Sequence, residues 1–327
     1  MDNLKKVGLT ALAGSLVAFS AQAGELTASG GAKITYTADT GNEDIAHDGN
    51  RFGLQKSVSF TGSGELDNGH TVSLSQVIAT TGTLTSTVLT YDMGDMGKLV
   101  YQEDSGDLGI GKIDDMMPTA DEEVSNGLDA EQTATNEGLV GKVDGGITGF
   151  NYAYTMDMAT INVGYGMGAD GNNDDGANSG AGSTTSSTSV AITATPMDGL
   201  TVFAGTGSKG TALSDDDHDT YGLTYAFGPL TVGYQHSEID FNATSSNDNE
   251  TDSFGISFAV NDNLSISYGE QDTEADGQAN DQEVEGISVG YSMGGISIKA
   301  HTNEGKNIAN TADNVSEHTE IAVSFAF

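Results

Sequence analysis

The sequence predicts an all-β protein: a 16-stranded antiparallel transmembrane β-barrel in a single domain. Two observations support this prediction. Apolar and polar residues alternate with a period of two in short segments along the whole chain, which is typical of strands with one dry and one wet face. Short turns and long polar loops alternate between these segments, as expected for strands that cross a membrane.

The strands are recognised by their alternating side chains. In the first candidate, Ile34 and Tyr36 flank Thr35, and the same pattern recurs over residues 149–156, 161–168, 230–235 and 320–327. About 16 such segments fill the chain. One face of each carries Ile, Val, Leu, Tyr, Phe or Met, and the other carries Thr, Ser, Gly, Gln or Asn. The first face suits lipid and the second a water-filled lumen, whereas a soluble sandwich needs apolar faces that meet.

The connections fall into two classes. Short turns are expected at Asp67–Gly69, Gly94–Asp95, Met156–Asp157, Met197–Gly199, Gly228–Pro229, Asn261–Asn263 and Gly294–Gly295. Long acidic loops are expected at Asp39–Asn50, Ala169–Ser183, Ser208–Asp217, Phe241–Asn249, Thr273–Asn280 and Glu304–Val315. In a membrane barrel the short turns face the periplasm and the long loops face outward. The barrel must close because lipid offers no partners for backbone N–H and C=O groups.

The N-terminus resembles an export signal. A basic start is followed by the apolar stretch Val7–Ala21 and by an A-x-A site that ends at Ala23. These are the three parts of a secretory signal peptide. We therefore expect residues 1–23 to be removed by cleavage before Gly24, which leaves residues 24–327 as the barrel domain.

The composition argues against several function classes. The 48 acidic residues outnumber 11 basic residues, for a net charge of −37, which repels the phosphates of nucleic acids. The absence of cysteine excludes disulfide scaffolds, thiolate metal sites and cysteine nucleophiles. Beyond the N-terminal stretch there is no apolar run of about 18–20 residues that could form a membrane helix. No catalytic motif is recognisable, so the sequence predicts no enzyme.

One acidic run is a candidate metal site. Asp215, Asp216, Asp217 and Asp219 surround His218, and carboxylates are the ligands that Ca²⁺ and Mg²⁺ prefer. A solvated acidic loop is the simpler interpretation. We therefore expect no cofactor, other than Ca²⁺ or Mg²⁺ bound loosely in external loops.

The last strand carries a family resemblance. Residues 319–327 alternate in polarity and end on Phe327, which resembles the C-terminal strand that the outer-membrane assembly machinery reads in the general porins of Gram-negative bacteria. The segment that ends at Ala23, the hairpins and one long connection after the fifth strand add to the resemblance, which spans the mature chain. It implies a homotrimeric 16-stranded diffusion channel in the outer membrane, in contact with lipid and lipopolysaccharide.

The resemblance also implies that the connection after the fifth strand folds into the barrel and narrows it. Its counterpart is the segment 104–137, in which Lys112 is the one cation among many carboxylates. The expected constriction residues are Asp104, Asp107, Asp114, Asp115, Asp121, Glu122 and Glu123. Apolar residues at Leu108–Ile110 and Ile113–Pro118 would anchor the segment inside the barrel. An unanchored external loop is the alternative.

Porins of this type place basic side chains on the wall that faces this loop. Lys33 and Lys299 lie at lumen positions within strands, and Arg51 and Lys98 lie at lumen positions near strand ends. Lys56 conflicts with the pattern because it lies on the apolar face, where charge is costly in lipid. It would snorkel, lie at a subunit interface or mark a bulge. Alternatively, each cation merely solvates the wall.

Together these features predict a passive, water-filled channel for ions and small hydrophilic solutes. The carboxylates of the inward loop favour cations. Two alternatives remain. An exported acidic β-protein of the adhesin or surface type would depend on Ca²⁺. A substrate-specific outer-membrane channel would line its lumen with aromatic residues, whereas Tyr and Phe here mostly fall on the lipid face.

Overall fold

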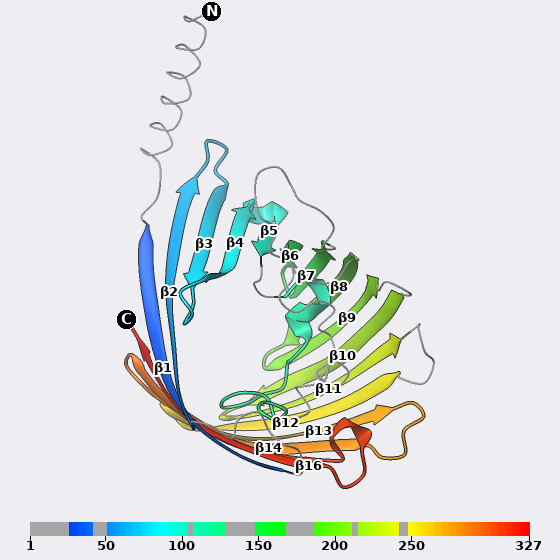
Figure 1. Ribbon diagram of the computed structural model, residues 1–327. Helices are drawn as coiled ribbons and strands as arrows, with labels where there is room; N and C mark the ends of the chain where they lie inside the picture. Colours follow the sequence, from blue (N-terminus) through cyan, green and yellow to red (C-terminus); the bar gives the residue numbers. More distant parts are fainter. Residues whose placement is uncertain are drawn as a thin grey trace, which may run out of the picture.

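The computed structural model describes residues 26–41, 51–103, 107–128, 148–167, 186–210, 215–241 and 248–327. Within these residues, sixteen antiparallel strands follow one another in sequence order and form one closed barrel (Figure 1). The first strand closes the ring by pairing with both the second and the sixteenth. The predicted fold class is confirmed. The expected signal peptide, with its cleavage site at Ala23 and Gly24, lies outside the described residues.

Most strands have 8 to 15 residues, and β5 has 6. They are β1 (Thr27–Gly41), β2 (Phe52–Glu65), β3 (Thr71–Ile78), β4 (Leu84–Asp92), β5 (Lys98–Glu103), β6 (Gly149–Met156), β7 (Ala159–Gly166), β8 (Ser187–Met197), β9 (Leu200–Gly210), β10 (Asp215–Phe227), β11 (Leu230–Phe241), β12 (Asn249–Asn261), β13 (Leu264–Ala275), β14 (Gln282–Met293), β15 (Ile296–Lys306) and β16 (Val315–Ala326). Three short 3₁₀ helices are described: η1 (Gly94–Met96), η2 (Gly109–Ile113) and η4 (Ile308–Asn310). None of the described helices is long and apolar enough to cross a membrane.

The two faces of the barrel are inverted relative to a soluble protein. On the outer face, large apolar side chains are exposed, such as Ile287 at 55%. On the inner face, polar side chains are buried, such as Gln271 at 1%. Apolar side chains gain by facing lipid and polar ones by facing a wet interior, so this arrangement fits a barrel surrounded by lipid.

Several strands extend further than the alternation indicates. Most of the loop expected at Ser208–Asp217 is strand, because β9 continues to Gly210 and β10 begins at Asp215. The sequence obscures these strand ends because polar residues occupy both of their faces. The acidic run after Ser214 therefore belongs to a strand and not to a loop.

The strand extensions place carboxylates on the outer face instead of in loops. Asp252 lies opposite Asp272, and Glu270 lies opposite Glu285. Like charges at directly opposed positions repel. The Tyr268 hydroxyl lies 3.1 Å from a carboxylate oxygen of Glu270 and of Glu285, and it shares its one proton between them, which partly offsets this repulsion. Together with Asp217 and Glu274, which fell within expected loops, these carboxylates form the outer ends of β10, β12, β13 and β14.

Candidate functional site

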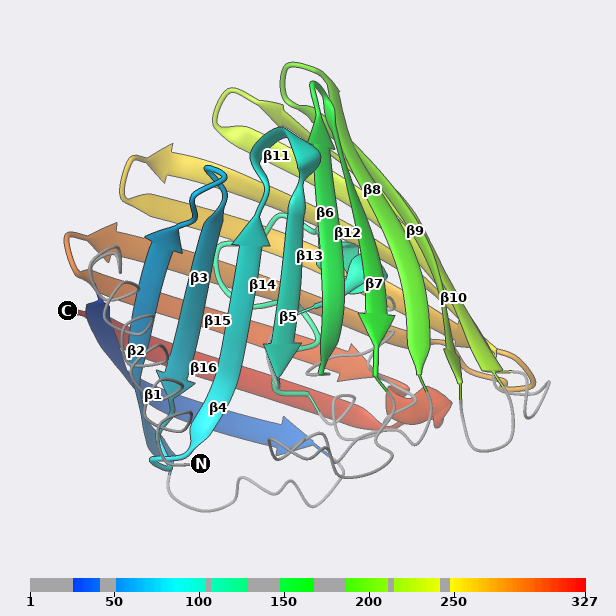
Figure 2. The ribbon, with the colours of Figure 1, turned by 90° about the horizontal axis from the view of Figure 1, so that it is seen from above.

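The connection between β5 and β6 enters the barrel. Its described part, residues 107–128, is called the inward segment here and lies against the inner wall (Figure 2). It begins at η2, which packs on β7, β8 and β9. The backbone N–H of Gly109 donates to Oδ1 of Asn151 at 2.9 Å, and that of Ile110 donates to Oγ of Ser189 at 3.1 Å. Polar wall positions thus satisfy the backbone of the segment.

An apolar cluster holds the start of the inward segment. Ile110 and Ile113 are buried against Ala191 and Phe203, and partly buried methionines complete the cluster. Burial of these side chains on a wall that is otherwise polar favours one position of the segment. Ile110, Ile113 and the methionines belong to the apolar stretches that were expected to anchor the segment, whereas Ala191 and Phe203 lie on the wall.

A row of glycines forms the track on which the inward segment lies. A Cβ atom on Gly205 would come within 2.8 Å of Ile110, and one on Gly233 within 2.6 Å of Pro118. Both distances are shorter than real Cβ contacts, so a side chain there would displace the segment. The members of this glycine track are Gly164, Gly205, Gly233, Gly255, Gly269 and Gly290. Period-two alternation placed these residues on the polar face without indicating a contact with the segment. Their recurrence at lumen positions was the signal for the track.

The tip of the inward segment is held by Asp121. Its Oδ2 accepts a 2.8 Å hydrogen bond from Nδ1 of His301, and its Oδ1 lies 3.2 Å from Nζ of Lys299. The Asp121 side chain is 4% exposed and that of His301 is 1% exposed. Burial by itself would raise the pKa of Asp121, but the hydrogen bonds from His301 and Lys299 and the charge of Lys299 hold it below its ordinary value. The ionised carboxylate is therefore the stable form at neutral pH.

A second ion pair lies beside the first. Nζ of Lys33 is 3.7 Å from Oε1 of Glu122 and 3.1 Å from Oε1 of Glu320 on β16. Because β1, β16 and β15 are consecutive in the barrel, Lys33 and Lys299 lie on the same side of the lumen. Both lysines contact the inward segment directly, whereas the expectation was a basic wall across the lumen from it.

The other two expected wall cations lie away from the inward segment. Arg51 precedes β2. Its guanidinium donates to Oη of Tyr36 at 3.2 Å, and Tyr36 lies on the outer face. Lys98 is at the β4–β5 turn, and its Nζ lies 2.8 Å from Oδ2 of Asp92. The four cations therefore form no continuous row. The lumen position expected for the Arg51 side chain is wrong, because Arg51 precedes β2 and its guanidinium bonds to an outer-face residue. For Lys98, strand phase did not predict the partner.

Hydroxyl side chains line the inner wall of β2–β4. The inward positions of these strands, which the structure describes in full, include no Lys or Arg. They carry mainly Ser and Thr, among them Ser57, Ser59, Thr61, Ser63, Thr71, Ser73, Ser75, Ser86 and Thr90. In the barrel order these strands lie between β1, whose Lys33 contacts the inward segment, and β6, whose Asn151 also contacts it. Glu65 and Asp92, both opposite Thr71 at the ends of these strands, are the carboxylates on this wall, which otherwise presents mainly hydroxyl groups to the lumen.

The remaining constriction candidates have separate positions. Asp104 lies outside the described residues, and Asp107 lies beside Gly111. Oδ1 of Asp114 accepts from the N–H of Asp115, and Oδ1 of Asp115 accepts from the N–H of Met117. The carboxylates of Asp114 and Asp115 thus stabilise local turns of the segment.

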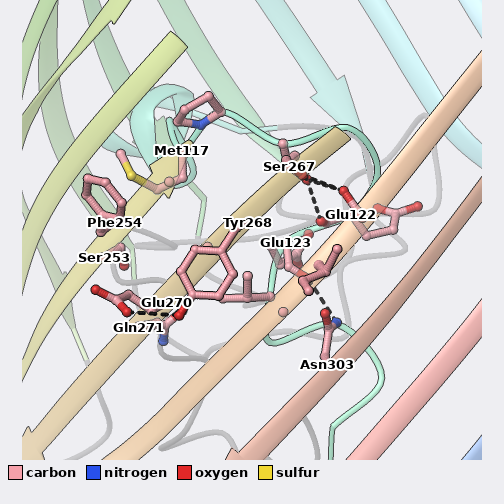
Figure 3. Close-up of a pocket in the computed structure, with 18 of the residues that line it drawn as sticks. Met117, Glu122, Glu123, Ser253, Phe254, Ser267, Tyr268, Glu270, Gln271 and Asn303 are labelled. Atoms are coloured by element: carbon pink, nitrogen blue, oxygen red, sulfur yellow. Dashed lines mark hydrogen bonds between the residues drawn. The ribbon is translucent and has the colours of Figure 1, made fainter. Parts of the chain in front are cut away.

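A pocket lies between part of the inward segment and the wall of β12–β15 (Figure 3). It has an empty volume of about 440 Å³. Glu122 and Glu123 border it on the segment side, and Ser267, Gln271 and Asn303 border it on the wall side. This is where the segment carries carboxylates beside polar wall residues.

The candidate metal residues do not converge. Asp217 and Asp219 are exposed on the outer face of β10, whereas the intervening His218 is buried on the inner face. Asp215 opens the strand, and Asp216 is in phase with His218. Because successive side chains of a strand point to opposite faces, the acidic side chains of residues 215–219 do not lie together as they could in a loop. In the described part of the chain, no group of three or more His, Asp or Glu side chains could hold a metal ion.

The C-terminal Phe327 lies at the closing seam of the barrel. Its backbone N–H donates to the oxygen of Gly30 at 3.0 Å, and its oxygen accepts from the N–H of Gly30 at 2.8 Å. The chain end is therefore a continuation of the β16–β1 pairing.

The fold is similar to that of known proteins. A model of the Gram-negative porin family matches residues 8–326. A loop L8 deletion mutant of OmpT, an outer-membrane protein of Vibrio cholerae, has a TM-score of 0.67 at 14% identity, over 93% of this chain and 99% of that chain. A mutant of the Rh. blastica porin has a TM-score of 0.63 at 13% identity, over 93% and 100% of the two chains. A search of curated protein sequences gave no significant match.

The structural similarities by themselves concern the fold, since identities near 14% leave function open. The family model adds the sequence evidence, because it covers nearly the whole chain. Strands with an apolar outer face are what an outer-membrane location requires. The chain therefore belongs to the Gram-negative porin family and forms an outer-membrane channel protein.

Proposed function

We propose that this porin is a passive channel for ions and small hydrophilic solutes that prefers cations, with no enzymatic role. The observation that carries the proposal is the unequal charge of the lumen. On the inward-segment side, the three carboxylates of Asp121, Glu122 and Glu320 outnumber the amines of Lys33 and Lys299 that contact them. An excess of fixed negative charge beside a pore lowers the free energy of cations there.

The opposite wall supports the same preference. A row of cations there would create a transverse field and provide a path for anions. The inner faces of β2–β4 carry hydroxyl groups and no such row. Hydroxyl groups can donate to and accept from water and neutral solutes alike, so this wall suits unspecific passage of hydrophilic molecules.

The experiment is a reversal-potential measurement in planar bilayers under a KCl gradient. We expect a potential of the sign given by K⁺ permeation, and a smaller potential for the double variant Glu122→Gln/Glu123→Gln. The matched control is Asp217→Asn/Asp219→Asn, which removes the same charge from the outer face of β10. An anion-selective wild type, or equal effects of the two double variants, would contradict the proposal.

We also propose that the channel is a homotrimer with β2–β4 at the subunit contact. A trimer form is described for OmpT of Vibrio cholerae, which has a TM-score of 0.63 with this chain at 13% identity. On the outer face of β2–β4, Lys56, Gln76 and Thr87 lie among apolar side chains, and Nε2 of Gln76 donates to Thr87 at 3.4 Å. Polar and charged side chains at such positions fit a protein contact better than lipid.

Two further partners of the channel are the outer-membrane assembly machinery and lipopolysaccharide. Phe327 ends a strand whose pattern would be read by the assembly machinery, and the acidic outer ends of β10–β16 would meet lipopolysaccharide. A substrate-specific channel remains the second candidate. Competition by added sugars or amino acids for the K⁺ current separates the two, since a general pore shows no saturable block.

A further inference from the structure

The connection between β15 and β16, residues 307–314, turns back over the barrel wall. Asn307, Asn310 and Asp313 all have positive φ angles, of 50°, 54° and 61°. Asn and Asp tolerate this left-handed conformation better than other residues with a side chain. Three such residues within eight produce a compact connection, which we call the outer connection.

Side-chain amides tie the outer connection to its neighbours. Nδ2 of Asn310 donates to the backbone oxygens of Thr273 and Asn280 at 3.2 and 2.9 Å, and Nδ2 of Asn307 donates to that of Asp281 at 3.0 Å. These acceptors lie at the ends of β13 and in the β13–β14 connection. The outer connection is therefore held across the outer end of β14.

This arrangement buries one large apolar side chain. Ile308 is 1% exposed and packs against Val284 of β14 and against Leu128, which is itself 1% exposed. Val124 packs against the same cluster. Leu128 and Val124 belong to the inward segment, so the outer connection contacts the far end of the segment that enters the lumen after β5.

The wall beside this cluster is shaped to receive the same end of the inward segment. Nδ2 of Asn303 donates to the backbone oxygens of Asn126 and Glu123 at 2.9 and 3.3 Å. A Cβ atom on Gly305 would come within 3.3 Å of Leu128 and closer still to Ile308. Residues 123–128 are therefore bounded by β15 on one side and by the outer connection on another.

We propose that Ile308 is a positioning residue of the channel: it clamps residues 124–128 against β14 and β15 and thereby sets the open cross-section of the lumen. This inference rests on the proposed channel function. The contact is apolar, so it does not titrate and salt does not screen it. The ion pairs of Asp121 and Glu122 depend on both pH and salt. The clamp therefore keeps residues 124–128 in place when acid or high salt weakens the ion pairs of Asp121 and Glu122.

The test compares Ile308→Ala with Ile287→Ala, which makes the same change on the lipid face of β14. Single-channel recordings in 1 M KCl should show increased current noise and additional conductance levels for Ile308→Ala, and a wild-type trace for Ile287→Ala. Ile308→Leu should restore the steady trace. Heat-modifiable migration on a gel checks that each barrel is folded. Equal traces for Ile308→Ala and Ile287→Ala would overturn the proposal.

A second measurement does not require conduction. Hydrogen–deuterium exchange of the detergent-folded barrel should increase severalfold over residues 124–128 in Ile308→Ala but not in Ile287→Ala. A wild type that carries no current would remove the channel function, while the exchange result would still decide the clamp. Unchanged exchange in Ile308→Ala would reject the clamp even if the wild type conducts.

The chain contains no cysteine, so two introduced cysteines would have no other thiol to pair with. A disulfide between them can therefore test the same contact. In the variant Leu128→Cys/Ile308→Cys, oxidation should give a steady trace in 1 M KCl and reduction should restore the noise. Formation of the disulfide without any effect on noise would also count against the clamp.

Discussion

The carboxylate of Asp121 lies 2.8 Å from Nδ1 of His301, and both side chains are almost completely buried inside the barrel. The two residues are 180 positions apart in the chain. Their contact joins the tip of the inward segment to β15, with Lys299 as the second partner of the carboxylate. The segment is therefore attached to the wall at its tip, in addition to the apolar cluster of Ile110 at its start.

Asp121→Asn should loosen the tip without unfolding the barrel. The change keeps the size of the side chain but removes the charge that Lys299 and His301 contact. Hydrogen bonds to charged groups contribute about 1.5–3 kcal/mol, and the strand pairing of the barrel remains. We expect noisier single-channel currents and a nearly unchanged unfolding temperature. Asp198→Asn, in the exposed β8–β9 turn, is the control, and noise equal to this control would refute the role of Asp121.

Acid should weaken the same contact at a defined pH. The pKa of Asp121 is lower in the folded protein than its ordinary value of about 3.9. The contribution of a group with a lowered pKa is fully present above the ordinary value and is lost as pH falls through the lowered value. Current noise should therefore stay constant from pH 7 to about 4 and rise below it. Asp121→Asn should lack this rise, and an equal rise in that variant would contradict the role of Asp121.

Gly205→Ala should displace the start of the inward segment. The added Cβ would lie 2.8 Å from Ile110 and 3.0 Å from Ile113, so one of these side chains must move. Overpacking of this kind typically costs about 1–3 kcal/mol. We expect a changed single-channel conductance and a lower unfolding temperature. Gly62→Ala is the matched control, because its Cβ would meet its nearest neighbour at an ordinary 3.7 Å. Equal results for the two variants would argue against the glycine track.

Lys56→Met should distinguish a subunit contact from a lipid contact. A lysine at the lipid face near the membrane midplane costs about 2–4 kcal/mol, so an apolar replacement there would stabilise the barrel. At a polar contact between subunits, the same replacement removes a partner and weakens the oligomer. We expect Lys56→Met to lower the temperature at which the oligomer dissociates in detergent. A higher dissociation temperature would place Lys56 in lipid.

Much of the fold could be predicted from the sequence. Alternation around residues such as Ile34 and Tyr36 gives the strands, their faces and their number, because a strand in lipid must present apolar side chains on one side. The same rule correctly placed Lys56 on the outer face. It failed at the outer ends of strands such as β10, where Asp217 and Asp219 face outward beyond the apolar region and polarity no longer distinguishes the two faces.

The candidate site could be predicted only in part. The acidic composition of the connection after β5 and its apolar anchors were visible in the chain. Its contacts were not, because Asp121 meets Lys299 and His301, and Glu122 meets Lys33, only after sixteen strands have closed into a ring. Period-two alternation reports which face a side chain occupies. Which residues share that face as neighbours depends on strand register and barrel closure, which the tertiary structure alone decides.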